Sequence, residues 1–315
     1  MSRRAWMAFA AVSLIWGIPY LFIRIAVRGG VTPLVLAWGR LTLAAVVLIA
    51  LAWRAGRLSD ARGPWRWLFA YAVVEVSIPF PLIAFGEQHV ASSVAAIVIA
   101  AVPLIGAVLA LRFDRSERPT PLRAVGLVIG FAGVIALVGI DVAGRPDELL
   151  GTGAILVAAV GYSIGPMIIK HRLGGLDPRA TIGVSLAIAS LLLAPGAALD
   201  LPSRTPTAGA VASVVVLGLV CTAAAFVILT MLIHEAGTSR AMVITYINPV
   251  VAVALGVTLL GEQPGAGAVA GLLLILAGSW LSTGGRLPPP LHRMRVRRRR
   301  SEMRLRASSA VSPPN

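Results

Sequence analysis

The sequence predicts an all-α integral membrane protein, with ten transmembrane helices arranged as two inverted five-helix repeats. Three observations lead to this fold class. The chain is 57% hydrophobic and 13% charged, with a mean hydropathy of +0.87, so it is far more apolar than an average soluble domain. Its apolar residues form blocks of about 20, the length at which a helix spans the bilayer core. The second half of the chain also repeats the first.

The apolar blocks define the expected spans. Only helices and closed barrels satisfy their backbone polar groups in lipid, and these blocks are too long and too uniformly apolar for barrel strands. The third and fourth blocks are separated only by residues 86–89, and we divide them there because the second half breaks at the matching residues 234–237. The expected spans are 6–26, 33–53, 65–85, 90–111, 122–140, 151–169, 180–199, 210–233, 239–260 and 265–282.

An internal duplication sets the domain organisation. Matching residues lie 146 positions apart, or 145 after one gap, which is the signature of a repeat architecture. The clearest pairs are Ser93 with Ser239, Pro103 with Pro249 and Glu117 with Glu262. We therefore expect a first five-helix repeat over 1–140, an outer linker over 141–150, a second repeat over 151–284 and a basic, disordered cytoplasmic tail over 285–315.

The basic residues predict the orientation, because they are retained on the cytoplasmic side of a membrane. With the N-terminus inside, 23 of the 28 basic residues fall on inner segments, and the outer loops hold only Arg28, Arg145 and Arg204. Five spans is an odd number, so the second repeat enters from the opposite face and forms an inverted pair with the first. We expect a multi-pass protein of the cell membrane with both termini cytoplasmic.

Several function classes lack the residues that they need. Lys170 is the only lysine, and no glycine-rich phosphate loop precedes it, which argues against ATP hydrolysis. The four histidines are scattered and Cys221 is the single cysteine, so we expect no enzyme activity, no cofactor and no metal site. A channel would carry a filter loop or rings of like charge, and neither is present in the sequence.

The C-terminal tail carries nine arginines against one acidic residue, Glu302, and includes the run 297–300. Such a composition is typical of disorder. Beside a membrane this tail is expected to contact anionic lipid headgroups, and we do not expect nucleic acid to be its partner.

Two spans carry glycines at the spacing of closely packed membrane helices. Gly126 and Gly130 lie in the fifth span, and Gly267 and Gly271 lie in the tenth. We interpret them as intramolecular contacts first and as a homodimer face second.

Passage of a small molecule through the bundle is the function class that remains. A secondary transporter needs a site near the bilayer midplane, between repeats, in helices weakened by glycine or proline. Such residues occur here in pairs: 16–20 in the first span opposite 161–166 in the sixth, and Pro103 in the fourth opposite Asn248-Pro249 in the ninth. Both prolines lie about 13 residues into their spans, or about 20 Å along a helix, toward the bilayer interior.

The chain resembles the EamA branch of the drug/metabolite transporter superfamily. The resemblance rests on the doubled pattern of Trp16-Gly17, Pro33 with Arg40, Ser93 with Pro103, the Glu117 segment, and their echoes at Pro178, Pro249 and Gly261-Glu262. It implies two five-helix EamA-like units, with a central cavity lined by spans one to four and six to nine, and spans five and ten at the periphery. Such proteins move small metabolites such as amino acids, often outward, and their small-molecule substrates are their expected partners.

The chain departs from this family pattern in two places. Residues 114–117 read Asp-Arg-Ser-Glu where the family more often has Gly-Glu, and Ser185 stands where a second copy of Arg40 would lie. A non-transporting membrane scaffold or sensor with the same bundle is the alternative function.

Nine residues are candidates for the substrate cavity or for coupling. Trp16, Tyr20, Tyr162 and Tyr246 lie deep enough to line a cavity, and core packing has equal weight for each of them. The other candidates are Arg40, Glu75, Pro103, Asn248 and Pro249.

Arg40 and Glu75 are the ionisable residues that the sequence places deepest in the membrane. Charges at such depth face the bundle interior or a water-filled cavity and find partners. Two interpretations remain open: a fixed ion pair between the second and third spans, or a Glu75 that takes up a proton or a substrate amine while Arg40 receives a carboxylate.

Overall fold

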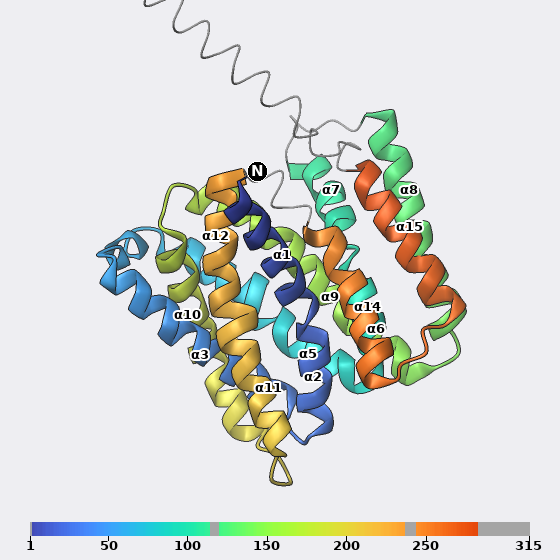
Figure 1. Cartoon of the computed structure of the whole chain (residues 1–315), viewed down its shortest axis with the longest axis horizontal. Coiled ribbons are helices and arrows are strands. Elements are labelled where there is room, and N and C mark those ends of the chain that lie inside the picture. Colours follow the sequence, from blue (N-terminus) through green and yellow to red (C-terminus); the bar gives the residue numbers. More distant parts are fainter. Residues whose placement is uncertain (1, 114–119, 237–243, 283–315) are drawn as a thin grey trace, which may run out of the picture.

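The computed structural model describes residues 2–113, 120–236 and 244–282, and the regular structure in these ranges is entirely helical (Figure 1). The α-helices are α1 (Arg3–Gly17), α2 (Pro19–Arg28), α3 (Pro33–Arg54), α4 (Trp65–Tyr71), α5 (Pro79–His89), α6 (Ser92–Ile99), α7 (Val102–Phe113), α8 (Pro121–Ala136), α9 (Pro146–Ile168), α10 (Pro178–Leu199), α11 (Ala208–Gly218), α12 (Ala225–Ala236), α14 (Ile244–Leu260) and α15 (Ala266–Ser282). A short 3₁₀ helix, η1 (Leu58–Ala61), follows α3. Four π-helical turns continue or join the longer helices: η2 (Ala72–Ser77), η3 (Leu137–Val142), η4 (Ile169–Leu173) and η5 (Leu219–Ala224).

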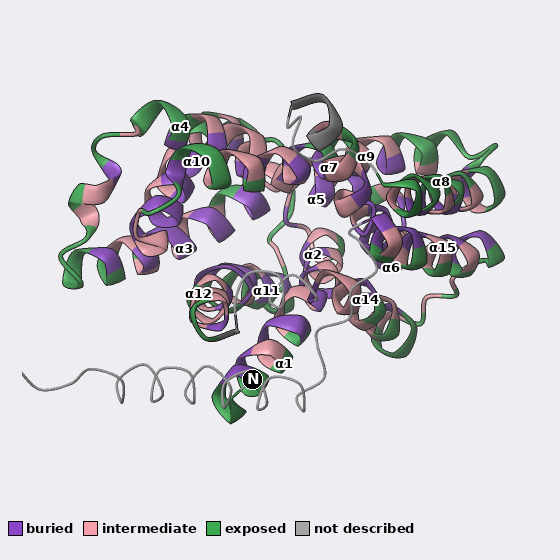
Figure 2. Ribbon diagram, turned by 90° about the horizontal axis from the view of Figure 1, so that it is seen from above, coloured by how far each residue is buried: buried purple, intermediate pink, exposed green. Residues whose placement is uncertain are grey.

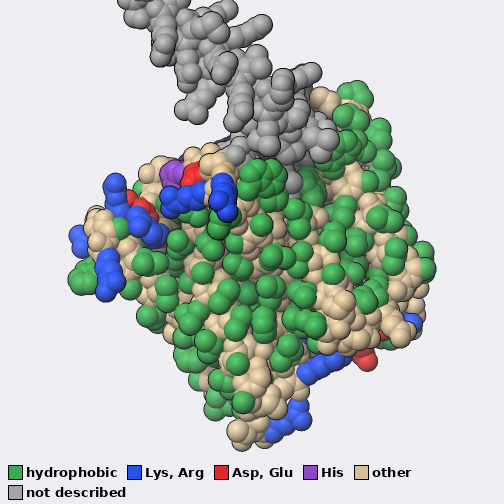
Figure 3. All heavy atoms as spheres, in the orientation of Figure 1, with side chains coloured by type: hydrophobic (Ala, Val, Ile, Leu, Met, Phe, Trp, Pro, Cys, Tyr) green, Lys and Arg blue, Asp and Glu red, His purple; other side chains and the backbone are tan. Residues whose placement is uncertain are grey.

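The helices have the length and surface of membrane spans. Within the described residues, eight helical segments are long and apolar enough to cross a bilayer, and two shorter apolar helices, α14 and α15, follow them. Their outer faces are apolar: Val128 and Ile135 of α8 are each 70% exposed, and Leu191 of α10 is 74% exposed. Figure 3 shows charged side chains at two ends of this face, with a broad hydrophobic band between them. A band of exposed apolar side chains is suited to lipid and not to water.

Proline interrupts two of the helical spans at positions where the sequence predicts an interruption. The first span divides at Ile18 into α1 and α2, directly before Pro19. The fourth divides at Ala100 and Ala101 into α6 and α7, directly before Pro103. Proline has no N–H to donate and its ring clashes with the carbonyl four residues earlier, so the helix is interrupted on its N-terminal side.

The sixth span differs from the expectation, because α9 runs unbroken through residues 161–166. The glycines there allow close packing and do not break the helix. A Cβ added at Gly161 would collide with the carbonyl oxygen of Val74 and lie 2.9 Å from Pro79, so α9 lies directly against the π-helical turn η2. In the ninth span, α14 likewise continues through Pro249.

The boundary that we predicted after residue 85 is wrong, because α5 continues to His89. Gly86 explains the extension: a Cβ at this position would lie 2.5 Å from Ile155 and 2.8 Å from the carbonyl oxygen of Gly151, both in α9. The close contact with α9 holds the last turn of α5 inside the bundle. Glu87 therefore lies in a buried helix and not in a loop.

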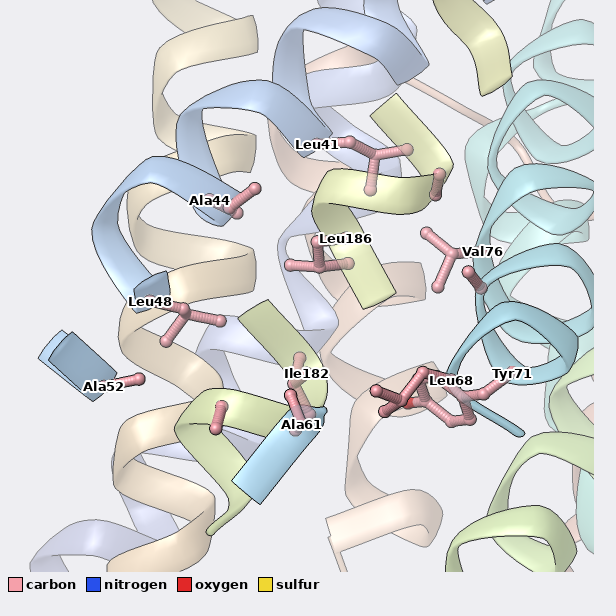
Figure 4. Close-up of a cluster of buried hydrophobic side chains, with 14 of the residues drawn as sticks. Leu41, Ala44, Leu48, Ala52, Ala61, Leu68, Tyr71, Val76, Ile182 and Leu186 are labelled. Carbon is pink, nitrogen blue, oxygen red and sulfur yellow. The ribbon is translucent and has the colours of Figure 1, made fainter. Parts of the chain in front are cut away.

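Two helix pairs lie at opposite ends of the bundle, as Figure 2 shows, with α3 and α10 at one end and α8 and α15 at the other. The α3 and α10 pair encloses an apolar cluster with α4 and η2, in which Leu48 of α3, Leu186 of α10 and Leu68 of α4 are buried (Figure 4). The remaining long helices pack between these two pairs.

Helices α8 and α15 approach each other through glycines. A Cβ at Gly133 would lie 2.9 Å from the carbonyl oxygen of Gly271, and one at Gly278 would lie 2.6 Å from that of Gly126 and collide with the backbone of Gly130. The interpretation as intramolecular packing is therefore confirmed. A homodimer face at these glycines stays a prediction.

We expect Gly278→Ala to lower the melting temperature of the purified protein, because the added methyl group forces α15 away from α8. Overpacking of this kind costs ~1–3 kcal/mol. Gly139→Ala is the matched control, since a Cβ there meets nothing within 4 Å. Equal thermal unfolding midpoints for the two variants would contradict this account of the α8 and α15 contact.

Candidate functional site

Arg40 is the centre of the candidate site. It is buried, and its Nε donates a hydrogen bond of 2.9 Å to Oγ1 of Thr222. Its guanidinium carbon lies 4.2 Å from the centre of the Phe80 ring, a cation–π contact. These partners come from η5 and α5, so both halves of the chain hold the cation. No carboxylate in the described part of the chain forms an ion pair with Arg40, so the site can accept an anionic group.

The local structure around Thr222 explains how η5 reaches Arg40. A π-helical turn leaves backbone groups available, and the Thr222 hydroxyl donates to the carbonyl oxygen of Leu217 at 2.8 Å while it accepts from Arg40. Gly218 lets α11 approach α3, because a Cβ there would lie 2.9 Å from the carbonyl oxygen of Arg40. Single π-helical turns are frequent at functional sites.

Aromatic side chains extend the site beyond Phe80, and a further aromatic pair lies between α1 and α12. The ring of Tyr162 in α9 packs edge-on against Phe80, with 6.4 Å between ring centres. Trp16 of α1 packs edge-on against Phe226 of α12 at 5.8 Å. Tyr20 and Tyr162 both pack, partly buried, against one apolar cluster between α2, α5, α9 and α11. Two of the predicted aromatic residues, Tyr20 and Tyr162, therefore share one cluster, whereas Trp16 packs in a separate cluster with α12 and α14.

Glu75 lies against α9 and not against Arg40. Its carboxyl group occupies the space beside Gly165, where an added Cβ would collide with it, and Oε2 is buried without a hydrogen-bond partner among the described residues. The interpretation as a fixed Arg40–Glu75 ion pair is not supported, since the described residues show no such pair. Depth along a helix does not determine the direction of a side chain, and the π-helical turn η2 rotates Glu75 relative to a regular α-helix.

The predicted residues of the fourth and ninth spans have structural contacts. The Tyr246 hydroxyl donates to the carbonyl oxygen of Ser279 at 3.3 Å, so this side chain points toward α15. The Asn248 amide, in the orientation that satisfies it, donates to the carbonyl oxygens of Ser13 at 3.1 Å and Ile244 at 2.9 Å. Pro249 is buried in α14. Next to Pro103, the carbonyl oxygen of Val102 accepts from the Ser163 hydroxyl at 3.0 Å.

A second polar cluster, which the sequence analysis missed, lies where α5 ends. Glu87 is completely buried, and neither of its carboxyl oxygens has a hydrogen-bond partner among the described residues. One nitrogen of Arg24, Nη1, donates to the carbonyl oxygens of Glu87 and Val90, the latter at 3.0 Å. No pattern in the sequence indicated this cluster, because residues 86–89 have the composition of a polar loop, and only the structure places Glu87 on the same helix as the apolar residues before it.

Glu262 joins this second cluster from the other half of the chain. Its carboxylate accepts from the backbone N–H of Ser92 at 2.8 Å and of Ser93 at 2.9 Å, at the start of α6. Burial raises the pKa of Glu262, but the hydrogen bonds from Ser93 and Ser92 outweigh burial and hold this pKa below its usual value. Glu262 is therefore an ionised helix cap that links α6 to the segment before α15.

A groove of about 580 Å³ lies between α3 and α10, and Arg40 is not among the residues that line it. Its walls are almost entirely apolar, and Val46 and Leu191 on its rim are largely exposed on the lipid-facing surface. A hydrogen bond of 2.6 Å between the hydroxyls of Thr42 and Ser190 joins the two helices there. The groove suits lipid chains better than a polar substrate.

Known proteins are similar to this chain in sequence and in fold. The model of the EamA-like transporter family matches residues 4–139 and again residues 149–284. An "Uncharacterized transporter" of Archaeoglobus fulgidus is 26% identical over 281 residues, 88% of this chain and 98% of that protein. The "Uncharacterized inner membrane transporter YedA" of Escherichia coli K12 is 29% identical over 263 residues, 81% of this chain and 82% of that protein. A crystal structure aligns with a TM-score of 0.65 at 24% identity, over 89% of this chain and 97% of that chain.

Proposed function

Since the chain belongs to the EamA-like transporter family and is a multi-pass membrane transporter, we propose that it is a secondary transporter that exports small metabolites such as amino acids. The observation that carries the substrate class is Arg40, a buried cation without a carboxylate partner among the described residues. Arginine binds a planar carboxylate through two parallel hydrogen bonds. Glu75, with one unpartnered oxygen, is the complementary group for a substrate amine.

The substrate carboxylate would bind Arg40 and its amine would bind Glu75, on either side of the Phe80 and Tyr162 rings. Arg40 stacks on Phe80, Phe80 packs against Tyr162, and Glu75 contacts Gly165, one turn after Tyr162 in α9. The sequence of contacts therefore connects the two charged groups through aromatic surfaces. Such surfaces suit the apolar part of an amino acid.

We propose alternating access between two inverted repeats of five transmembrane helices each. The family model matches the chain twice, which supports the duplication. The helix packing supports the duplication as well. If each span of one half is replaced by the equivalent span of the other half, the same set of helix contacts results. The second and seventh spans pack together as α3 with α10, the fourth and ninth as α6 with α14, and the fifth and tenth as α8 with α15. The contact of α5 with α9 corresponds to that of α11 with α2.

Both termini are proposed to lie in the cytoplasm. A tag after Asn315 or at the N-terminus is expected to be inaccessible to reagents outside intact cells, whereas a tag inserted near Gly144 is expected to be accessible, because basic residues concentrate on the inner segments. Labelling of the C-terminal tag from outside intact cells would contradict this orientation.

Residues 285–315 lie outside the described part of the chain, and we propose that this basic segment contacts anionic lipid headgroups. A homodimer through the peripheral helices is a second assembly proposal. Neither is required by the Arg40 site, which lies within one chain.

Growth on toxic amino acids and their analogues tests the proposed function. Cells that overproduce the protein are expected to tolerate at least one compound of such a panel better than cells that overproduce the Arg40→Met variant at the same level. Equal sensitivity across the whole panel would contradict amino acid export and favour the alternative, a membrane scaffold or sensor with the same bundle.

A further inference from the structure

Glu87 lies in an environment that disfavours its charge. It is the third residue from the end of α5, it is 0% exposed, and both of its carboxyl oxygens lack a partner among the described residues. An ionised carboxylate only accepts hydrogen bonds, at about four lone-pair sites. A protonated carboxyl group is neutral and has fewer acceptor sites that need a donor. Burial without donors therefore favours the protonated group.

Arg24 lies near Glu87 but does not satisfy the carboxyl group. Its Nη1 donates to the backbone carbonyls of Glu87 and Val90, and its Nε is buried without a partner among the described residues. The cation thus sits at the C-terminal end of α5, which carries the negative end of the helix dipole. The carboxyl oxygens themselves receive nothing from it.

The charges in the cluster balance when Glu87 is neutral. Arg24 supplies one positive charge, and Glu262 supplies one negative charge that the N–H groups of Ser92 and Ser93 hold in place. An ionised Glu87 would add a second negative charge beside Glu262 in a buried region. Of the two carboxyl groups, Glu87 is the one without donors among the described residues, so its surroundings favour the proton at Glu87.

The charged and titratable neighbours of Glu87 within the described residues lie on α5 itself and on the elements around it. Those that act on it electrostatically are Arg24, Glu262, Arg40 and Tyr20, from α2, α3 and the segment before α15. The helices packed against α5 also carry Arg28, Arg54, Glu75, Asp147, Glu148 and Tyr162; α6 carries none, and His89 is the neighbour on α5 itself.

The hydroxyl groups of Ser92, Ser93 and Thr152 lie near the starts of α6 and α9, two helices that pack against α5. The described residues contain eight buried side-chain atoms without a hydrogen-bond partner, and six of them belong to Arg24, Glu87, Ser92, Ser93 and Thr152. A hydroxyl group both donates and accepts, so it can pass a proton along. Gln88, the next residue after Glu87, is exposed. The cluster lies at the end of the bundle that we assign to the outside.

We propose that Glu87 is the carboxyl group that binds the coupling proton of this transporter, from the outer solution; this inference rests on the proposed transport function. One O–H bond breaks in a hydronium ion and one forms at a Glu87 oxygen. The reverse transfer to water takes place when the site faces inward. A metal cation fits the cluster less well, because Arg24 would repel it and, in the described residues, no three His, Cys, Asp or Glu side chains gather to hold one.

The position of Glu262 relates the proton at Glu87 to the opening of the helix bundle at its outer end. Glu262 belongs to the second half of the chain and caps α6 of the first half, so it closes the bundle at that end. A neutral Glu87 is compatible with this closed contact. Loss of the proton adds a second negative charge that repels the one on Glu262 and weakens the contact, so protonation and outer closure go together.

Two measurements on the full chain in liposomes test the proposal. Infrared spectra at neutral pH are expected to contain a carbonyl band of a protonated carboxyl group that Glu87→Gln removes and Glu148→Gln retains. Glu148 is the matched control because it lies near the same end of the bundle, paired with Arg145 at 3.0 Å. In flux assays without any gradient, Glu148→Gln is expected to exchange labelled for unlabelled amino acid at the wild-type rate, and Glu87→Gln is expected to retain measurable exchange.

With an imposed pH gradient, the wild-type protein is expected to accumulate substrate about tenfold per pH unit, because one proton per substrate carries that driving force, whereas Glu87→Gln reaches only equal concentrations. Should Glu87→Gln fail to fold, Glu87→Asp is expected to shift the carbonyl band instead of removing it. The proposal is overturned if the band is unchanged in Glu87→Gln and Glu87→Asp, or if a sodium gradient and not a pH gradient drives accumulation. A wild-type protein that shows the band but moves no amino acid contradicts the transport function and leaves the proton at Glu87 in place.

Discussion

Arg40→Lys is expected to abolish most amino acid transport while the protein folds and inserts normally. Lysine keeps the positive charge but loses the planar fork that binds a carboxylate through two hydrogen bonds. A hydrogen bond to a charged group contributes ~1.5–3 kcal/mol, so we expect kcat/KM to fall ~10–150-fold. The rate of uptake into liposomes over a range of substrate concentrations measures this change.

Arg204→Lys is the control for a general effect of replacing arginine, since Arg204 is exposed and donates to the carbonyl oxygen of Arg28 at the outer surface. Thr222→Val adds a finer comparison, because it removes the acceptor of the Arg40 Nε hydrogen bond with little change in volume. We expect it to raise KM less than Arg40→Lys does. Wild-type kinetics in Arg40→Lys would remove Arg40 from the substrate site.

Glu75→Gln is expected to leave the folded protein intact and to raise KM about tenfold for amino acids, the effect of losing ~1.4 kcal/mol of charged hydrogen bonding to the substrate amine. A substrate analogue that keeps the carboxylate but lacks the amine is expected to be transported equally by both proteins. The ratio of KM values for the two compounds is the measurement. A Glu75→Gln protein with an unchanged ratio would show that Glu75 does not bind the amine.

The position of Glu75 can be disturbed without changing its charge. Gly165→Ala places a methyl group in the space of the carboxyl group, whereas Gly153→Ala adds one to the same helix where nothing lies within 4 Å. We expect Gly165→Ala to reproduce the KM change of Glu75→Gln and Gly153→Ala to behave as the wild-type protein.

The sequence predicted the features of the fold that depend on local chemistry. The apolar blocks coincide with helices long enough to cross the membrane or with the two shorter apolar helices. The breaks before Pro19 and Pro103 follow from the missing N–H and the clash of the proline ring, which act on the residues directly before each proline. Arg40 was identified because a charge in the middle of an apolar block needs a partner.

The parts that could not be predicted depend on which helices pack together. Residues 86–89 have the composition of a polar loop, yet they are helical because α9 packs against Gly86. Arg40 has two partners, Thr222 and Phe80. Both come from segments distant in the sequence, and Thr222 lies in the other half of the chain. The π-helical turns η2 and η5 rotate Glu75 and Thr222 to their positions, and no pattern of composition indicates such turns.

The most direct test of the central claim is transport by the purified chain alone. The protein in liposomes, with a labelled amino acid from the growth panel and an imposed pH gradient, is expected to move that amino acid against its own concentration gradient, and to stop when the pH gradient is collapsed. Liposomes with the Arg40→Lys variant provide the background. Flux equal to that background for every amino acid tested, with or without the gradient, would contradict the account of this chain as a proton-coupled amino acid transporter.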